Sequence, residues 1–316
     1  MTYTNFRPML AAKITNADLD DLDYPLYMQP KFDGIRCLVS ANINSEDPVF
    51  SRSLKPIPNK LIVDQLSVLK YLCLDGELTM EAPNRRDSFN FTTGFVRQHL
   101  TSSNCSSCDS VFRLLGNVTY NIFDCFQQPT DPFYRRHNSL MDFVELPHRQ
   151  IKLNIVQKQL ALHPGDVSDY YAVQVDKGYE GIILRASHSP YKFNRSTVKQ
   201  GYLLKLKGVQ RFQATILDCK PLLRNHNKAQ TDSLGLTKRT SHKDNKVADD
   251  LLGKFIVQDT EEQFSQFAVG SGFTEAERIQ LWEIRSELKG KKIWVEYQAH
   301  GSIERPRAPI FKGFVK

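Results

Sequence analysis

The chain has 316 residues, 41% of them hydrophobic, which is enough to bury a sizeable core in two domains and excludes a disordered tail. No stretch is long and apolar enough to span a bilayer, and the first residues lack the apolar core of a secretory signal, so we expect a cytoplasmic protein that does not bind a membrane. The formal net charge of +7 favours a polyanionic partner such as nucleic acid, although it would also serve solubility alone.

Strands with interspersed helices are predicted for the first two-thirds of the chain. Residues 28–40 predict two strands separated by a tight turn at Asp33 and Gly34. In residues 59–70, apolar side chains recur among polar ones, as is typical of an amphipathic helix. Further strands, rich in apolar and aromatic residues, are expected at 70–79, 119–126, 180–187 and 202–207. Strands and helices do not alternate regularly, which disfavours a Rossmann sheet and predicts an α+β domain of antiparallel sheets with helices over residues 1–207.

The pattern changes after Lys207. Residues 224–250 are polar and basic with almost no apolar side chains, which indicates a mobile loop or connection. Short strands are expected beyond it, at 253–258, 266–272 and 291–298. Thr274 and Glu277 have the spacing of a capping box and predict a helix between these strands. We therefore expect residues 208–316 to form an all-β domain of the OB-fold type.

The cysteines do not predict a metal site. Three of the six cysteines lie inside strand-like runs, as small buried hydrophobic residues often do. Cys105 and Cys108 form a single C-x-x-C in a serine-rich stretch. A zinc site would need two more ligands at a suitable spacing, and no second pair exists, so we do not expect structural zinc.

Lys31 is the candidate nucleophile. It opens the segment K-F-D-G-I-R, residues 31–36. A lysine becomes nucleophilic only when burial or neighbouring cations lower its pKa. Taken alone, a lysine before an Asp-Gly turn is more often a solvated hairpin residue, so the assignment depends on the other segments of the chain.

Three of those segments place acids on strands. In L-D-G-E-L, residues 74–78, Asp75 and Glu77 share one strand face, which suits hydroxyl recognition or Mg²⁺ binding. Glu180 stands at the mouth of an apolar strand, and Phe123 adds an aromatic ring beside an acid. Each of these segments alone is more often an ordinary half-buried strand.

The lysines of L-L-K-L-K, residues 203–207, suit phosphate binding. Alternation sends Leu204 and Leu206 to the core and Lys205 and Lys207 to the opposite face. Two parallel ammonium groups can bind phosphate and would depress the pKa of a third lysine nearby. Together the segments supply a lysine nucleophile, Mg²⁺ ligands and phosphate-binding cations, the set that nucleotidyl transfer through a phosphoramidate requires.

The same segments, in the same order, resemble the successive motifs of the lysine nucleotidyltransferases. These segments are residues 31–36, 51–53, 74–78, 122–124, 180–185 and 203–207. The closing R-A-P-I-F-K-G-F, residues 307–314, resembles the last motif of ligases, although Val315 stands at a commonly basic position. Residues 189–196 and 234–246 are similar to short phage-type ATP-dependent DNA ligases. The likeness covers nearly the whole chain.

This resemblance implies a role for each matching residue of the first domain. Lys31 would be the adenylated nucleophile, and Glu77 would bind the AMP ribose and, with Glu180, the metal. Phe123 would stack on adenine. The cations implied to contact the nucleotide sugar, the nick phosphate or the ATP phosphates are Arg36, Arg52, Lys205 and Lys207.

The resemblance also implies an activity and partners. The expected protein is a monomer of a bacterial or phage-infected cell that uses ATP and Mg²⁺ to seal nicks in double-stranded DNA. Arg307 and Lys312 would orient the leaving pyrophosphate. The basic segment 224–250, with Lys238 and Arg239, would contact DNA. The alternatives are an RNA ligase or capping guanylyltransferase, which share the central motifs, and a non-catalytic nucleic-acid-binding protein with an OB barrel.

Overall fold

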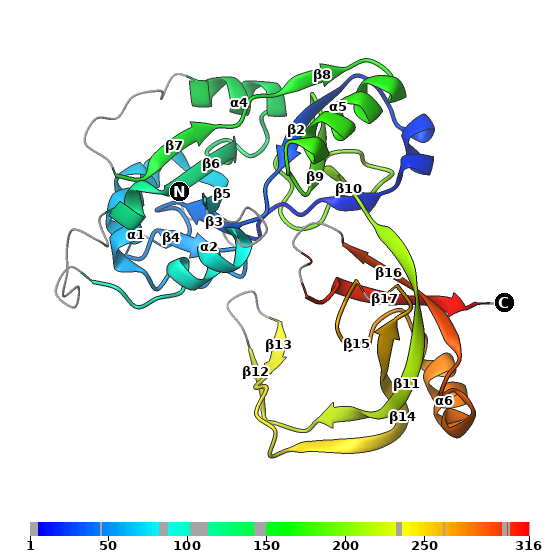
Figure 1. Ribbon diagram of the computed structural model, residues 1–316. Helices are drawn as coiled ribbons and strands as arrows, with labels where there is room; N and C mark the ends of the chain where they lie inside the picture. Colours follow the sequence, from blue (N-terminus) through cyan, green and yellow to red (C-terminus); the bar gives the residue numbers. More distant parts are fainter. Residues whose placement is uncertain are drawn as a thin grey trace. The chain divides into compact units, whose positions relative to one another are not determined.

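The computed structural model describes residues 6–44, 46–81, 88–101, 113–141, 150–231, 236–261, 263–298, 302 and 304–315. The chain divides into two compact units, residues 1–207 and 208–316 (Figure 1). Cys105 and Cys108 lie outside the described residues. Among the helices that are described, none is both long enough and apolar enough to cross a membrane.

The first unit contains two five-stranded sheets. One sheet has the order β1 (Ala12–Ile14), β10 (Leu204–Lys207), β9 (Gly181–Ala186), β2 (Leu26–Lys31) and β8 (Gln159–Ala161). Helices η1 (Asn16–Asp21) and α5 (Pro164–Asp176) contact it. Its core includes Met28, Ile182 and Leu184, all without solvent exposure. The predicted alternation in β10 is confirmed, because Leu204 and Leu206 are buried in this core.

The other sheet carries most of the helices of this unit. Its order is β4 (Val49–Ser51), β3 (Ile35–Val39), β5 (Leu74–Met80), β6 (Val118–Cys125) and β7 (Lys152–Ile155). Its helices are α1 (Lys60–Leu66), η2 (Ser67–Leu72), α2 (Ser88–Val96) and α4 (Phe133–Met141). The predicted amphipathic helix is confirmed as α1 with its 3₁₀ continuation η2. The Asn59 side chain caps α1 by accepting the N–H groups of Leu61 and Ile62.

The two strands predicted around Asp33 and Gly34 are confirmed as β2 and β3, but they belong to different sheets. The intervening turn therefore carries the chain from one sheet to the other and does not close a hairpin. A Cβ at Gly34 would clash with the carbonyl of Leu78 on β5, so only glycine allows this close crossing. The crossing places Lys31, at the end of β2, beside the second sheet.

The second unit is built on a five-stranded sheet whose edges meet. The order is β15 (Phe267–Val269), β14 (Lys246–Asp259), β11 (Gln210–Asn225), β16 (Lys292–Gln298) and β17 (Arg307–Phe314). The N–H of Phe311 on β17 donates to the carbonyl of Ser271, just beyond β15 (2.9 Å), which closes the sheet. Aromatic rings, among them Phe212, Phe255 and Tyr297, fill the core. This is the expected OB-type barrel.

The helix predicted from Thr274 and Glu277 is α6 (Glu275–Glu283). The Thr274 hydroxyl accepts the Glu277 N–H at 3.2 Å, and the Glu277 carboxylate accepts the Thr274 N–H at 2.7 Å. The predicted capping box is therefore confirmed, and α6 packs against β14.

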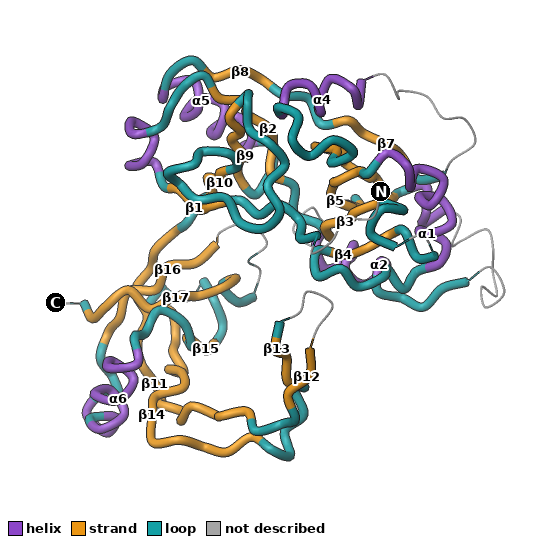
Figure 2. The backbone as a smooth tube through the Cα atoms, turned by 180° about the vertical axis from the view of Figure 1, so that it is seen from behind, coloured by secondary structure: helices purple, strands orange, loops and turns teal. Residues whose placement is uncertain are grey.

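Residues 224–250 are not the loop that was expected. Strands β11 and β14 continue as a two-stranded ribbon as far as the pair Asn225 and Lys246, and β12 (Ala229–Thr231) pairs with β13 (Thr237–Arg239) beyond it. Figures 1 and 2 show this extension, which we call the arm (residues 222–231 and 236–250). The prediction was wrong because main-chain pairing forms these strands, and hydrophobic patterning does not detect such pairing.

Candidate active site

Three neighbouring strands bring Lys31, Glu180 and Lys207 together. Lys31 at the end of β2 pairs with Gly181 at the start of β9, and Lys207 at the end of β10 pairs with the same glycine from the other side. The Glu180 N–H donates to the Lys31 carbonyl at 3.1 Å. Gly181 has a φ of 149°, and a Cβ there would clash with the Leu206 carbonyl, so this close approach requires glycine.

The Glu180 carboxylate bridges the two lysines. One oxygen accepts a hydrogen bond from Lys31 Nζ, and the other accepts one from Lys207 Nζ. The Glu180 side chain is 4% exposed, whereas Lys31 and Lys207 retain 21% and 16%. Burial disfavours the charged carboxylate, but the two ammonium groups outweigh burial and lower the pKa of Glu180. The nucleophile candidate and a phosphate-binding candidate therefore share one anionic partner.

Lys205 completes the cationic face of β10. Burial, together with the nearby charges of Lys207, Lys31, Arg195 and Arg52, lowers the pKa of Lys205 to about 8. Arg52 lies exposed in the turn after β4, on the other sheet. The lowered pKa thus belongs to Lys205, a member of the lysine pair itself, and cations of both sheets contribute to it.

Arg36 is fixed by a buried carboxylate on the neighbouring strand. Its guanidinium donates to both oxygens of Asp75, at 2.6 and 2.5 Å, and to the Met9 carbonyl at 3.0 Å. Asp75 has no solvent exposure and also accepts the Tyr191 hydroxyl at 2.6 Å. A two-pronged ion pair of this kind sets the plane of the guanidinium. The Arg36 guanidinium lies 5.1 Å from the centroid of the Phe123 ring.

A β-bulge carries Phe123. Asp75 pairs with Asp124 and Gly76 pairs with Ile122, so Phe123 is an extra residue on β6. A bulge can turn one side chain out of the regular alternation. The Phe123 ring remains partly exposed while both of its neighbours are buried.

Behind this bulge lies a buried ion cluster. Asp124 accepts Arg136 Nε and Nη2 at 3.0 and 3.1 Å and also pairs with Arg185 of β9. The nearby arginines lower the pKa of Asp124 even though burial acts to raise it. The cluster joins β6 to β9 of the other sheet directly behind the ring of Phe123, which lies 5.8 Å from the Arg185 guanidinium.

Glu77 lies on β5, next to Arg36 of β3. It pairs in register with Arg36, and its side chain is half-buried on β5. Burial raises the pKa of Glu77 to about 7, with Lys31 and Arg36 acting in the opposite direction. Glu77 on β5 and Lys31 on β2 are therefore close enough for their charges to interact.

Gln29 is a buried polar residue of β2 that the sequence motifs do not include. It is 2% exposed and lies two residues before Lys31 on β2. Its Nε2 donates to the Val156 carbonyl at 3.0 Å, and the Val156 N–H donates to Ile122, the residue before Phe123 (2.8 Å). Among the described residues its Oε1 has no hydrogen-bond partner. A polar side chain at this position of an apolar strand was the available signal.

Comparisons with known proteins match both units. The family described as ATP dependent DNA ligase domain matches residues 8–207, and the DNA ligase OB-like domain matches residues 245–314. The chain belongs to the ATP-dependent DNA ligase family. These matches are to DNA ligases and not to the RNA ligases or capping enzymes considered above.

Relatives of this ligase-family chain are distant in sequence. A probable DNA ligase of Beutenbergia cavernae is 28% identical over 203 residues, 60% of this chain and 36% of that protein. A probable DNA ligase of Dictyoglomus thermophilum is 25% identical over 296 residues, 85% of this chain and 46% of that protein. The chain thus spans from about a third to about half the length of these curated relatives.

Solved structures of similar length share the fold of this family member. The Chlorella virus DNA ligase-adenylate has a TM-score of 0.54 and 25% identity, and 99% of each chain is covered. A Lig E DNA ligase has a TM-score of 0.64 and 18% identity, covering 98% of this chain and 99% of that one. The latter likeness concerns the fold alone.

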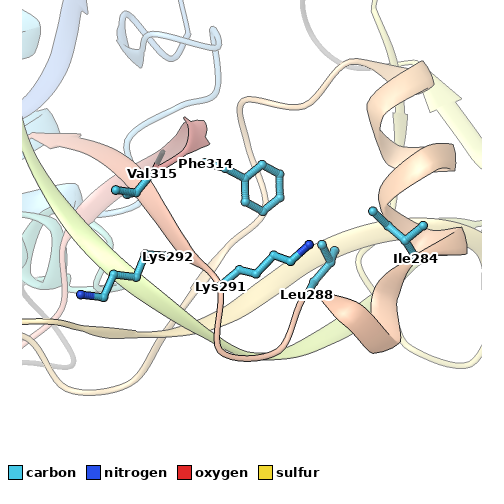
Figure 3. A pocket seen from close by; sticks show the side chains of 6 residues that line it. All are labelled: Ile284, Leu288, Lys291, Lys292, Phe314 and Val315. Carbon is cyan, nitrogen blue, oxygen red and sulfur yellow. The ribbon is translucent and has the colours of Figure 1, made fainter.

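The remaining predicted residues lie in the second unit of this ligase-family chain. Arg307 and Lys312 are on β17, where Lys312 Nζ lies 3.5 Å from the Glu296 carboxylate. Lys238 and Arg239 are exposed on β13 of the arm. A pocket of about 450 Å³ in this unit contains none of the predicted residues (Figure 3). It is lined by Ile284, Leu288, Lys291, Lys292, Phe314 and Val315.

Proposed function

We propose that the protein seals nicks in duplex DNA with ATP, through AMP bound covalently to Lys31. The observation that carries this proposal is the pairing of both Lys31 and Lys207 with Glu180. Arg36, the register partner of Glu77, lies over the Phe123 ring. Lys31 Nζ attacks the α-phosphorus of ATP and pyrophosphate leaves. The AMP then passes to the 5′-phosphate of the nick, and the 3′-hydroxyl attacks that phosphate and expels AMP.

Cations near Lys31 support the phosphoryl-transfer role. Negative charge on the non-bridging phosphate oxygens is stabilised when fixed cations lie within a partly dehydrated site. Lys205 and Lys207 occupy one strand face, and Arg52 adds charge from the other sheet. Phosphate oxygens that bind Lys207 would replace its contact with Glu180.

The nucleotide base and sugar would be held by residues of both sheets. Phe123 stacks on adenine, with Arg36 behind the ring and directed to the sugar. Glu77 accepts a ribose hydroxyl. The buried Oε1 of Gln29 accepts the 6-amino group of adenine, whereas guanine presents a carbonyl oxygen there. This pairing would relieve an unsatisfied buried acceptor and would favour ATP over GTP.

A magnesium ion fits this site only together with the nucleotide. Among the described residues, no three His, Cys, Asp or Glu side chains gather to hold a metal. Mg²⁺ usually takes one or two carboxylates plus substrate phosphates, so Glu180 and Glu77 suffice as protein ligands. When bound, the ion would neutralise charge on the phosphates.

The second unit would contribute DNA contacts and help to orient the leaving pyrophosphate. Arg307 and Lys312 would orient the pyrophosphate, and the arm, with Lys238 and Arg239, would contact the duplex. A basic surface of this kind binds DNA largely through phosphates. The proposal includes action as a monomer in the cytoplasm of a bacterial or phage-infected cell.

The direct test is the intact mass of the protein after incubation with Mg²⁺ and either ATP, GTP or NAD. We expect one AMP to be added with ATP alone. Lys31→Ala should lose the adduct, whereas Lys13→Ala, an exposed lysine of the same sheet, should retain it. An undiminished adduct on Lys31→Ala would exclude Lys31 as the nucleophile.

A further inference from the structure

His137 is a buried polar residue of α4 that the proposed reaction does not use. It is 2% exposed, and its ring packs edge to face against Phe133, with the ring centroids 5.5 Å apart. Its Nε2 lies 2.8 Å from the carbonyl oxygen of Val156, and among the described residues its Nδ1 has no hydrogen-bond partner. Burying an imidazole costs free energy that an apolar side chain of similar size would not cost. The bond to Val156 therefore distinguishes this histidine from an ordinary core residue.

The Val156 carbonyl determines which ring nitrogen of His137 carries the hydrogen. A carbonyl oxygen only accepts hydrogen bonds, so Nε2 must be the donor. Burial lowers the pKa of His137 to about 4, so the ring is neutral at neutral pH and Nδ1 carries no hydrogen. The ring thus offers one donor, and it is directed at Val156.

The same carbonyl accepts a hydrogen bond from Gln29. Gln29 Nε2 on β2 donates to it at 3.0 Å, while His137 Nε2 donates to it from α4. The Val156 N–H in turn donates to the Ile122 carbonyl of β6 at 2.8 Å. A carbonyl oxygen has two lone pairs, and these two donors use both. Val156 is therefore held from three elements of the first unit.

The Gln29 amide can meet this carbonyl in one orientation alone. Its NH₂ group must point to Val156, because a reversed amide would bring two oxygens together. This orientation leaves Oε1, which has no partner among the described residues, available to the base. The oxygen can accept the 6-amino group of adenine, whereas a reversed amide would donate to the 6-carbonyl of guanine. The orientation of this amide thus decides which purine is favoured.

We propose that His137 is a positioning residue for the choice of base: by holding the Val156 carbonyl in place, it keeps Gln29 Oε1 directed at adenine. The inference rests on the proposed adenylation of Lys31 and adds α4 to the elements that set the preference for ATP over GTP. Without the His137 donor, the carbonyl loses one of its two partners, and the Gln29 amide is no longer confined to one orientation.

The test is the kcat/KM of adduct formation on the whole chain, measured separately with ATP and with GTP. His137→Leu should lower the ratio of the ATP value to the GTP value by about five- to tenfold, as expected for one lost hydrogen bond. His137→Gln should keep most of the ratio, because its amide can place a donor near the position of Nε2. His188→Leu is the control, since His188 is an exposed histidine whose ring contacts Tyr134 of the same helix (5.8 Å), and it should leave the ratio unchanged. A purely structural role for His137 would lower both values alike.

A double variant shows whether His137 acts through Gln29. In a Gln29→Leu background no amide remains to be oriented, so His137→Leu should not lower the ratio further. If His137→Leu does not fold, His137→Asn replaces it, because the shorter amide does not reach Val156.

The inference is overturned if the variant without the donor keeps the wild-type ratio, or if it lowers the ratio equally with and without Gln29. Equal use of ATP and GTP by the wild type would also overturn it and leave the adenylation of Lys31 standing. A wild-type protein that forms no adduct with any nucleotide would instead overturn the proposed function.

Discussion

Replacing Glu180 with glutamine changes the carboxylate that joins Lys31, the proposed nucleophile, to Lys207. The carboxylate is 4% exposed and accepts hydrogen bonds from both Lys31 and Lys207. A glutamine of the same size offers its oxygen to only one of them and turns an N–H toward the other. At least one charge-assisted hydrogen bond is lost, worth about 1.5–3 kcal/mol. If this energy positions Lys31 in the transition state, Lys31 adenylation should slow by about 10- to 150-fold.

The assay is the single-turnover rate of adduct formation as a function of ATP concentration. The loss should appear in the rate at saturation more than in the ATP affinity, because the contact orients the reacting amine. Glu81→Gln, which alters an exposed acid of the same unit, is the matched control. An unchanged saturating rate for Glu180→Gln would refute the proposed role of this carboxylate.

The same variant has a predictable stability profile. The pKa of Glu180 is lower in the folded protein than its usual value of about 4.3, so its stabilising contribution is present above that pH. The contribution is lost as the pH falls through the folded-state pKa. The difference in free energy of unfolding between wild type and Glu180→Gln should therefore shrink in acid. A difference that stays constant down to about pH 2 would contradict the ion-pair explanation.

Two further predictions concern the nucleotide. Because the pKa of Lys205 is about 8, its positive charge is lost as the pH rises through that value, and the KM for ATP in adenylation should rise above pH 8. Lys205→Arg should flatten that rise, since arginine stays charged, and an identical pH profile would refute the assignment. Gln29→Leu removes the buried acceptor, so adenylation with ATP should lose about tenfold in kcat/KM while GTP changes less. An unchanged ratio between the two nucleotides would show that Gln29 does not contact the base.

Local sequence patterns were enough to predict where the strands of the candidate site lie along the chain. The direction in which Leu204, Leu206 and Lys205 point follows from the two-residue period of a strand, which needs no distant partner. The start of α6 was likewise predictable, because Thr274 and Glu277 bond to each other across one helical turn.

Tertiary structure alone decided which of these groups meet. Lys31 and Glu180 are 149 residues apart and become partners because β2 and β9 are neighbours in one sheet. The bulge at Phe123 depends on how β6 pairs with β5, and the unpaired oxygen of Gln29 depends on where Val156 lies. In the arm, the buried Asn227 side chain donates hydrogen bonds to the carbonyls of Thr240 and His242, a polar contact that hydrophobic patterning does not predict. Strand direction and helix caps are set by near neighbours, whereas pairing, bulges and buried polar contacts depend on residues that only folding brings together.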